Sequence, residues 1–260
     1  MADAMSAHVF GAAAAYYNPA GLSAPGSGAQ VLVMHQEWVE QIRMEHLGVR
    51  APLGEEDAFG VTLMTVTIPD IEVRTRPGPA DGTFTARNFE LGGSYARKMS
   101  DQLSLGITAK FLHEKIFLDE ASGFALDAGM RYATPIEGLN AALTLSNIGG
   151  MSSLRSSSTK LPASTRIGFS YAASIQDFSL LGATDIVYVF PDARASMGLG
   201  AEIVFENVVA GRAGYLFGSD TRSISAGIGV RYEIVDVDYA FSPLGSDLGS
   251  THTVSIIVNF

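Results

Sequence analysis

The sequence predicts an all-β protein: a transmembrane antiparallel β-barrel of about fourteen strands, preceded by a short N-terminal plug, or hatch. Three observations lead to this fold class. Many segments of about ten residues alternate apolar with small or polar side chains, and short and long connections alternate along the chain. In addition, no apolar run approaches the roughly 18 residues that a membrane-spanning helix needs. A chain made almost wholly of alternating segments is typical of outer-membrane barrels.

The first element, residues 1–28, does not follow the strand pattern. An Ala-rich stretch leads into the string Tyr17, Asn18, Pro19, Ala20, Gly21 and Leu22, and a Pro/Gly/Ser linker then runs through Gly28. A proline at position 19 prevents a helix from continuing, and a glycine at 21 favours a turn. Because the segment is too short for a domain of its own, we expect a plug at 1–28 that folds into the lumen of a barrel at 29–260.

The strands are recognised by their period of two, because successive side chains of a strand point to opposite faces. From 223 to 232, for example, Ile224, Ile228 and Val230 share the predicted lipid face, whereas Ser225 and Arg231 point inward. The predicted strands span residues 30–39, 41–51, 57–67, 87–98, 102–113, 122–133, 138–147, 164–173, 177–188, 196–206, 207–217, 222–232, 234–242 and 251–260.

The connections sort by parity, which indicates a barrel with periplasmic turns and extracellular loops. Those after even-numbered strands are tight, whereas those after odd-numbered strands include predicted loops at 68–86 and 148–163. Gly, Pro, Ser and Asp are frequent at 77–82, 151–159 and 243–249, which we place on the outer face. The first loop, near 39–41, is unusually short, and Arg43 and Glu45 share a face with Leu47.

The predicted inward faces are polar, which favours a filled interior over an open hydrophobic tunnel. Such charges commonly pair to fill space in small barrels. Glycines at 200, 214, 227 and 229 are expected to let the plug backbone approach the wall. The candidate lumen residues are Arg166, Glu202, Arg212, Arg231, Asp236 and Asp238.

Composition excludes several other functions. The absence of cysteine removes disulfides, thiolate zinc sites and thiol nucleophiles. A net charge of −10 argues against a nucleic-acid partner, because phosphate binding needs clustered Lys and Arg. The five histidines lack metal-ligand spacing with carboxylates, and no Ser/His/acid set is apparent. We therefore expect neither a catalytic site nor a metal or other cofactor.

Two groups of residues resemble known families. The string from Tyr17 to Leu22 resembles the hatch motif of the FadL superfamily of outer-membrane barrels. Further matches resemble the PorV/PorQ branch of that superfamily. They are His35, Trp38, Ile42, the Glu45 to Gly48 and Leu145 to Gly150 strings, Leu161, Pro162, Arg166, Gly168, the Leu199 to Glu202 and Arg212 to Tyr215 strings, Asp238 to Phe241, and Asp247 to His252.

The resemblance implies two possible functions. PorV-like proteins resemble accessory subunits of type IX secretion, which bind a large translocon barrel or its cargo, whereas FadL-like proteins pass hydrophobic small molecules through a plugged lumen. The polar inward faces favour the secretion role, with uptake of hydrophobic molecules as the alternative. A soluble all-β periplasmic protein is a third possibility.

The resemblance also implies a bacterial outer-membrane protein that contacts lipid and is assembled by the barrel assembly machinery. The last strand ends on Phe260, which resembles the signal that this machinery reads. In relatives, a further stretch and a signal peptide precede the hatch. We therefore expect that the start of this sequence is trimmed or misplaced, and export is inferred from the family.

Overall fold

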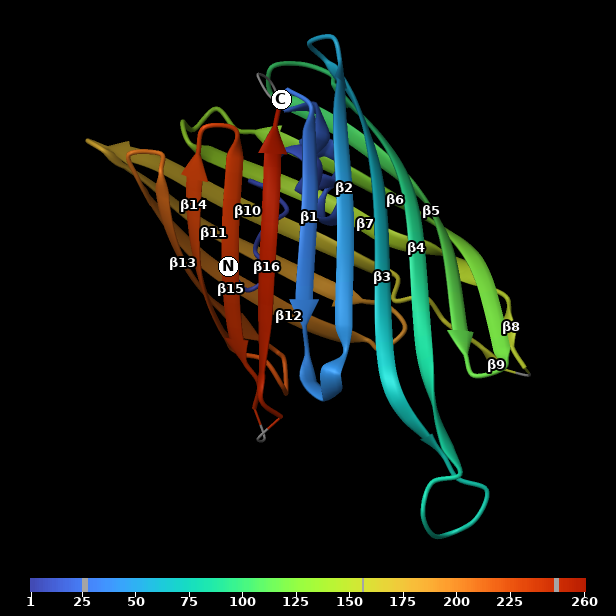
Figure 1. Ribbon diagram of the computed structural model, residues 1–260. Helices are drawn as coiled ribbons and strands as arrows, with labels where there is room; N and C mark the ends of the chain where they lie inside the picture. Colours follow the sequence, from blue (N-terminus) through green and yellow to red (C-terminus); the bar gives the residue numbers. More distant parts are fainter. Residues whose placement is uncertain (25–27, 156, 246–247) are drawn as a thin grey trace.

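A computed structural model describes residues 1–24, 28–155, 157–245 and 248–260. Within these residues, fourteen antiparallel strands close into one barrel, because β1 pairs with β2 on one side and with β16 on the other (Figure 1). The order around the barrel follows the chain, except that β8 and β9 form a separate two-stranded sheet between β7 and β10. The predicted fold class is confirmed.

Each predicted strand overlaps one observed barrel strand. These are β1 (Gln30–Glu37), β2 (Arg43–Leu53), β3 (Asp57–Val73), β4 (Gly82–Lys98), β5 (Leu103–Ile116), β6 (Asp119–Ala133), β7 (Leu139–Met151), β10 (Ser164–Ile175), β11 (Phe178–Val189), β12 (Arg194–Phe205), β13 (Val209–Phe217), β14 (Ile224–Tyr232), β15 (Val235–Pro243) and β16 (Ser250–Asn259).

The two faces of the strands differ as the alternation predicts. Apolar side chains on the outside are exposed, such as Ile107 at 60%, Phe124 at 71% and Ile228 at 53%. Their inward neighbours are buried, such as Thr108 at 1% and Asp127 at 5%. An apolar surface of this extent is unfavourable in water and is typical of a lipid-facing barrel wall.

The barrel has a turn end and a loop end. Short connections such as 54–56 and 233–234 lie at the turn end, whereas the opposite end carries the longest connections, including 74–81 and 152–163. The chain enters β1 and leaves β16 at the turn end (Figure 1). At the loop end, β1 and β2 are joined by the short 3-10 helix η3 (Val39–Gln41).

The irregular start of β2 has a local explanation. Arg43 and Glu45 point outward with Leu47, and the Glu45 carboxylate lies 2.7 Å from the Nδ1 atom of His35 on the neighbouring strand. Both strands are approaching their connection at the loop end here. We infer that this part of the wall lies beyond the lipid, where paired charges are tolerated.

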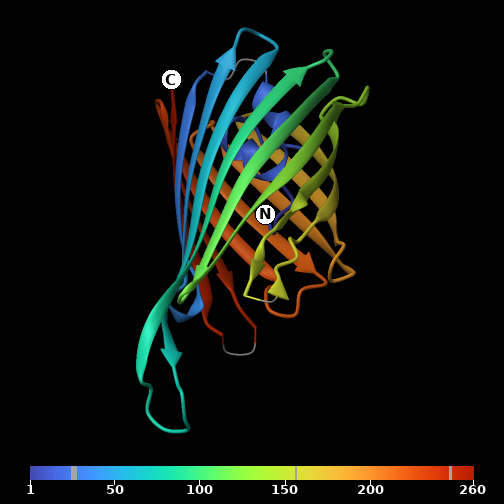
Figure 2. The same cartoon turned by 90° about the vertical axis from the view of Figure 1, so that its right-hand side faces the viewer.

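Two of the predicted loops are wrong in part. Residues 68–86 do not form one loop, because β3 continues to Val73 and β4 begins at Gly82, which makes a long hairpin that projects from the loop end (Figures 1 and 2). A register shift between Ile68 and Ile71, with Asp70 at a φ of 55°, interrupts the alternation there and hid the strand in the sequence.

The predicted loop at 148–163 also contains strands. Strand β7 extends to Met151, and β8 (Ser153–Leu154) then pairs with β9 (Ser157–Ser158). The predictions of a linker through Gly28 and of loops at 151–159 and 243–249 include residues 25–27, 156 and 246–247. For those six positions the predictions lie outside the described residues.

The N-terminal segment folds inside the barrel, as Figure 2 shows. It contains the 3-10 helix η1 (Gly11–Ala13), the α-helix α1 (Ala14–Tyr17) and the 3-10 helix η2 (Pro19–Ser23). In the part of the chain that the structure describes, no helix is both long and apolar enough to cross a membrane. The plug packs a small core against the wall, formed by Val9, Ala14, Ala15, Leu22, Ala58 and Ala96.

Candidate functional site

Glycines in the wall let the plug lie directly against the strands. A Cβ atom added to Gly106 would collide with the backbone of Pro19 and Ala20, and one added to Gly129 would collide with the Asn18 side chain. At Gly60 an added Cβ would lie 3.1 Å from Leu22. These glycines therefore create the space in which η2 sits between β3 and β6.

The predicted contacts of four other glycines are half right. Gly200 and Gly214 do lie against the first residues of the plug. Gly227 instead faces Tyr239 and Ala240 of the neighbouring strand, and Gly229 faces Asp238 and Arg212. The prediction for these two is wrong because the plug contacts β14 at Ser225, nearer the loop end. At Gly227 the nearest atoms belong to β15, and at Gly229 the Asp238 and Arg212 side chains fill the space.

The string from Tyr17 to Leu22 forms the part of the plug that enters this space. The Asn18 side chain accepts a hydrogen bond from the Ala20 amide at 3.1 Å, and its Nδ2 atom donates to the carbonyls of Ser6 and Met130. It thereby caps η2, crosses to the other part of the plug and binds the wall. Pro19 begins η2, which suits a residue without an amide hydrogen. Ala20, Gly21 and Leu22 are all buried.

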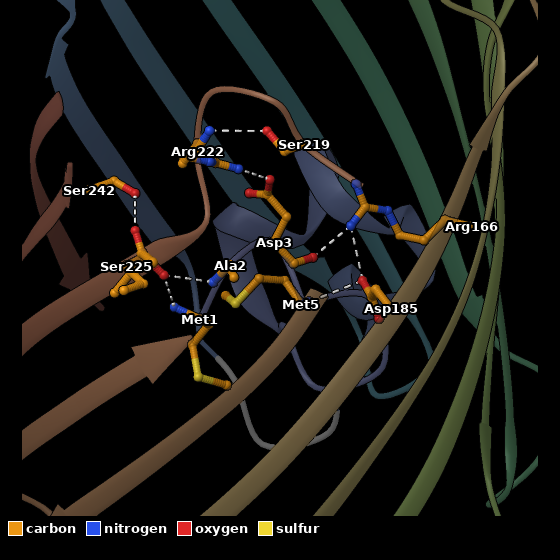
Figure 3. A network of polar contacts seen from close by, with 11 residues as sticks. Met1, Ala2, Asp3, Met5, Arg166, Asp185, Ser219, Arg222, Ser225 and Ser242 are labelled. Atoms are coloured by element: carbon orange, nitrogen blue, oxygen red, sulfur yellow. Dashed lines mark hydrogen bonds and ion pairs between the residues drawn. The ribbon is translucent and has the colours of Figure 1, made fainter. Parts of the chain in front are cut away.

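A carboxylate on β11 holds the first residues of the plug. Asp185 is 1% exposed and accepts hydrogen bonds from the amides of Met5 and Ser6, at 3.1 and 3.0 Å, and from the Ser6 hydroxyl at 2.8 Å. Arg166 lies 3.0 Å from the same carboxylate and also donates to the Asp3 carbonyl at 2.6 Å (Figure 3). We call Asp185 and Arg166 the plug anchor.

The loop end also contacts the plug. Arg222, in the connection between β13 and β14, forms an ion pair with the Asp3 carboxylate, and the Ala2 amide donates to Ser225 at 3.0 Å (Figure 3). The start of the plug therefore lies beneath a loop-end connection, whereas η2 lies against the turn-end halves of β3 to β6.

Three further wall residues bind plug backbone, and their role was missed in the sequence. Arg131 donates to the Ala7 carbonyl at 3.2 Å, Gln30 accepts from the Ala12 amide at 2.9 Å, and Arg50 donates to the Leu22 carbonyl at 2.6 Å. Their inward parity was readable from the strands. The plug atom that each of them contacts could not be predicted from the sequence, because the plug has no repeating geometry.

The predicted lumen residues separate into three places. Arg166 belongs to the plug anchor. Arg212, on β13, forms ion pairs with Glu202 on the neighbouring β12 and with Asp238 on β15, across β14. Arg231 and Asp236 pair at 2.7 Å close to the turn end, where the arginine side chain is 60% exposed. The structure does not bring all six together, and Phe260, at the turn end, is 73% exposed.

An apolar cavity of about 240 Å³ lies on the other side of the plug from the turn end. The inward faces of β3 to β5 form one side and residues 159–162 the other. Met64 follows Gly60 by four residues, so at ~3.3 Å per residue the cavity lies about 13 Å farther toward the loop end than the plug contact. Its apolar lining includes Met64, Val66, Leu112, Met151, Leu161 and Pro162.

A charged layer separates the cavity from the plug. The Lys110 ammonium lies 2.6 Å from the Asp127 carboxylate and 3.0 Å from the Asn147 side-chain oxygen. The backbone amide of Asn147 donates to the Asp127 carboxylate at 2.7 Å. Glu90 lies 3.9 Å from the same ammonium and also lines the cavity. The period of two in β5 places Lys110 on the inward face, but it does not show that the residues beyond it form an apolar cavity.

Burial shifts the pKa of two plug side chains in the direction that favours their neutral forms. It lowers the pKa of His8, and it raises the pKa of Tyr17 above its ordinary value. The Nδ1 atom of His8 is buried without a hydrogen-bond partner among the described residues. A plug that carries little charge can rest against the lumen wall without a large desolvation cost.

Comparisons with known proteins identify the fold. Neither a family model nor a curated protein matches this chain. Among solved structures, the CymD monoaromatic hydrocarbon channel aligns with a TM-score of 0.68 at 14% identity, over 98% of this chain and 94% of that one. A FadL homologue of Pseudomonas aeruginosa aligns at 0.64 and 12% identity, over 98% and 95%. The toluene transporter TodX of Pseudomonas putida aligns at 0.63 and 13% identity, over 99% and 96%.

These likenesses show that the chain shares its fold with these solved barrels. They extend over nearly the whole of each chain, so the barrel and its plug are both included. The proteins named are channels and transporters. At identities this low the likeness does not carry residue roles from those proteins to this one.

Proposed function

We propose that this protein is a non-enzymatic outer-membrane channel for small hydrophobic molecules. The observation that carries the proposal is the apolar cavity inside a plugged barrel. The fold, shared with proteins named as a hydrocarbon channel and a toluene transporter, supports it. A bacterial outer-membrane location follows from the same fold and from the exposed apolar wall.

The size of the cavity suits a small ligand. A cavity of roughly 150 Å³ lined by apolar side chains is enough to hold benzene. The volume here is about 240 Å³, which leaves room for a single aromatic ring with a substituent. Long-chain ligands would have to extend beyond it.

The plug then blocks the lumen between this cavity and the turn end. It is held by the plug anchor on one side and by the glycine contacts of η2 on the other. Passage of a molecule requires these contacts to rearrange, and a segment of short helices held by a few polar contacts can do so more easily than a strand of the barrel.

The secretion role, which the polar inward faces favoured in the sequence, is the less supported of the two. Its argument depended on a lumen without apolar surface, and the cavity supplies such a surface. Membership of the PorV/PorQ branch, docking to a translocon barrel or its cargo, and recognition of Phe260 by the assembly machinery stay predictions. The channel proposal itself includes contact of the barrel wall with outer-membrane lipid.

Uptake by cells tests the proposal. The chain is placed in the outer membrane of a bacterial host without a hydrocarbon channel, and the initial rate of labelled toluene uptake is measured. Val66→Trp fills the cavity and should reduce the rate to near that of the empty host. The matched control is Val61→Trp, on the same strand, because Val61 is 52% exposed on the lipid face.

Equal uptake by the two variants would show that toluene does not pass through the cavity. Co-purification from cells is the companion assay. The secretion role would be supported instead by two results together: a large barrel partner that the wild type retains and that is lost when residues 152–163 are shortened, and the absence of toluene uptake.

A further inference from the structure

The charged layer beneath the cavity is unevenly balanced. Asp127 and Asn147 occupy two of the three donors of the Lys110 ammonium at hydrogen-bond distance. The 3.9 Å between Lys110 and Glu90 is too long for a hydrogen bond. One lysine therefore faces two carboxylates, and Asp127, rather than Glu90, takes its closest contact.

Glu90 is left with unused acceptor capacity. Within the described residues its carboxylate forms no hydrogen bond, although its side chain is only 16% exposed. It lines the apolar cavity from β4, beside Met64 and Leu112, its partners in the sheet. A buried carboxylate accepts strong hydrogen bonds and is costly when it lacks them.

The remaining charges near the cavity make it unfavourable for anions. Glu114 is a second carboxylate in the lining, and the Thr159 hydroxyl donates to it at 3.4 Å. Lys160 also lines the cavity, but it is exposed to solvent. A ligand carboxylate placed beside Glu90 would meet a like charge, and Lys110, the cation nearest to Glu90, is already paired with Asp127.

We propose that the cavity binds small apolar molecules that carry one hydrogen-bond donor, a hydroxyl or an amine, which Glu90 accepts, and that it rejects carboxylates. This specificity rests on the proposed channel function and adds a polar end to its ligand. The apolar body of the ligand lies against Met64, Val66 and Leu112, and its donor points toward the charged layer.

Binding of four matched probes tests the specificity. Toluene, 4-methylphenol, 4-methylaniline and 4-methylbenzoate share one ring and differ in the group opposite the methyl. Their dissociation constants for the purified full chain are measured by equilibrium dialysis against protein-free detergent micelles. The phenol and the aniline separate a hydroxyl from an amine as the preferred donor.

The variants isolate the contribution of Glu90. From wild type to Glu90→Leu, the preference for 4-methylphenol over toluene should fall about tenfold, which corresponds to about 1.4 kcal/mol. In Glu90→Gln this preference should fall less, because the amide oxygen still accepts a hydrogen bond. The same variant should bind 4-methylbenzoate more tightly than the wild type does. Glu72→Leu, in the projecting hairpin, is the matched control and should change neither ratio.

An unchanged phenol-to-toluene ratio in folded Glu90→Leu, judged by heat-modifiable gel mobility, would overturn the assignment. So would wild-type protein that binds 4-methylbenzoate as tightly as 4-methylphenol, a result that needs no variant to fold. Failure of the channel function looks different: toluene would then bind Val66→Trp as well as it binds the wild type, whatever Glu90 does.

Discussion

The plug anchor offers the sharpest prediction about stability, through the substitution Asp185→Ala. This change removes the acceptor of three hydrogen bonds from Met5 and Ser6 and the partner of Arg166. The fourteen barrel strands keep their backbone pairing. The effect should therefore appear as a loosened plug in a folded barrel.

The magnitude follows from the burial of the pair. Breaking a buried ion pair by removing one partner costs about 3 to 5 kcal/mol, mostly because the other charge is left without compensation. Arg166 is 20% exposed and keeps its bond to the Asp3 carbonyl, so part of that cost is relieved by water. We expect about 3 kcal/mol, which corresponds to roughly a hundredfold larger population of the detached plug.

Hydrogen exchange of the folded protein in detergent measures this population. The amides of Met5 and Ser6 should exchange roughly a hundredfold faster in Asp185→Ala, while amides in the middle of β5 and β6 keep their protection. In Asp185→Asn these amides should exchange at a rate between those of Asp185→Ala and the wild type, because asparagine keeps an acceptor oxygen but loses the charge.

The matched control is Asp192→Ala, which makes the same chemical change at an exposed position in the connection that follows β11. It should leave plug exchange unaltered. If the amides of Met5 and Ser6 exchange at the same rate in both variants, the carboxylate of Asp185 does not hold the plug.

Three further results are expected. Ile228→Arg places a charge against lipid and should cost about 2 to 4 kcal/mol in unfolding from vesicles, whereas Ala240→Arg, on the inward face of the neighbouring strand, should cost less; equal losses would contradict the assignment of the two faces. Gly129→Ala should cost about 1 to 3 kcal/mol because its Cβ meets Asn18, and Gly93→Ala, which meets nothing within 4 Å, serves as its control. Because burial holds the pKa of His8 below 6.5, protonation favours the detached plug, so plug protection should decline as the pH falls below about 6.5 and should decline less in His8→Gln; identical pH profiles would exclude this cause.

The barrel could be predicted from the sequence because its rule is local. A wall between lipid and lumen imposes a period of two on every strand, and Ile228 beside Gly229 or Phe124 beside Ala125 follows it directly. The rule ends where the lipid ends. Past Ile68 the chain no longer has to alternate, so the outer part of β3 was assigned to a loop although its backbone pairs with β4.

The candidate site was only partly predictable, for a different reason. The inward position of Lys110 was clear, and Leu112 two residues later shares its face, but an apolar residue on an inward face has meaning only when its neighbours are known. The cavity joins Met64, Leu112 and Leu161 from three distant parts of the chain. Contacts of the plug, such as Asp185 with Ser6, likewise join residues whose spacing follows no period.

A crystal of the protein grown with 4-bromotoluene would show whether the cavity receives a small hydrophobic molecule. Anomalous scattering from bromine locates the ligand without interpretation of its shape. We expect a bromine peak between the inward faces of β3 to β5 and residues 159–162, within contact of Met64 and Leu112, and we expect the peak to be lost in Val66→Trp. Bromine found on the lipid-facing wall alone, with the cavity empty, would contradict this expectation.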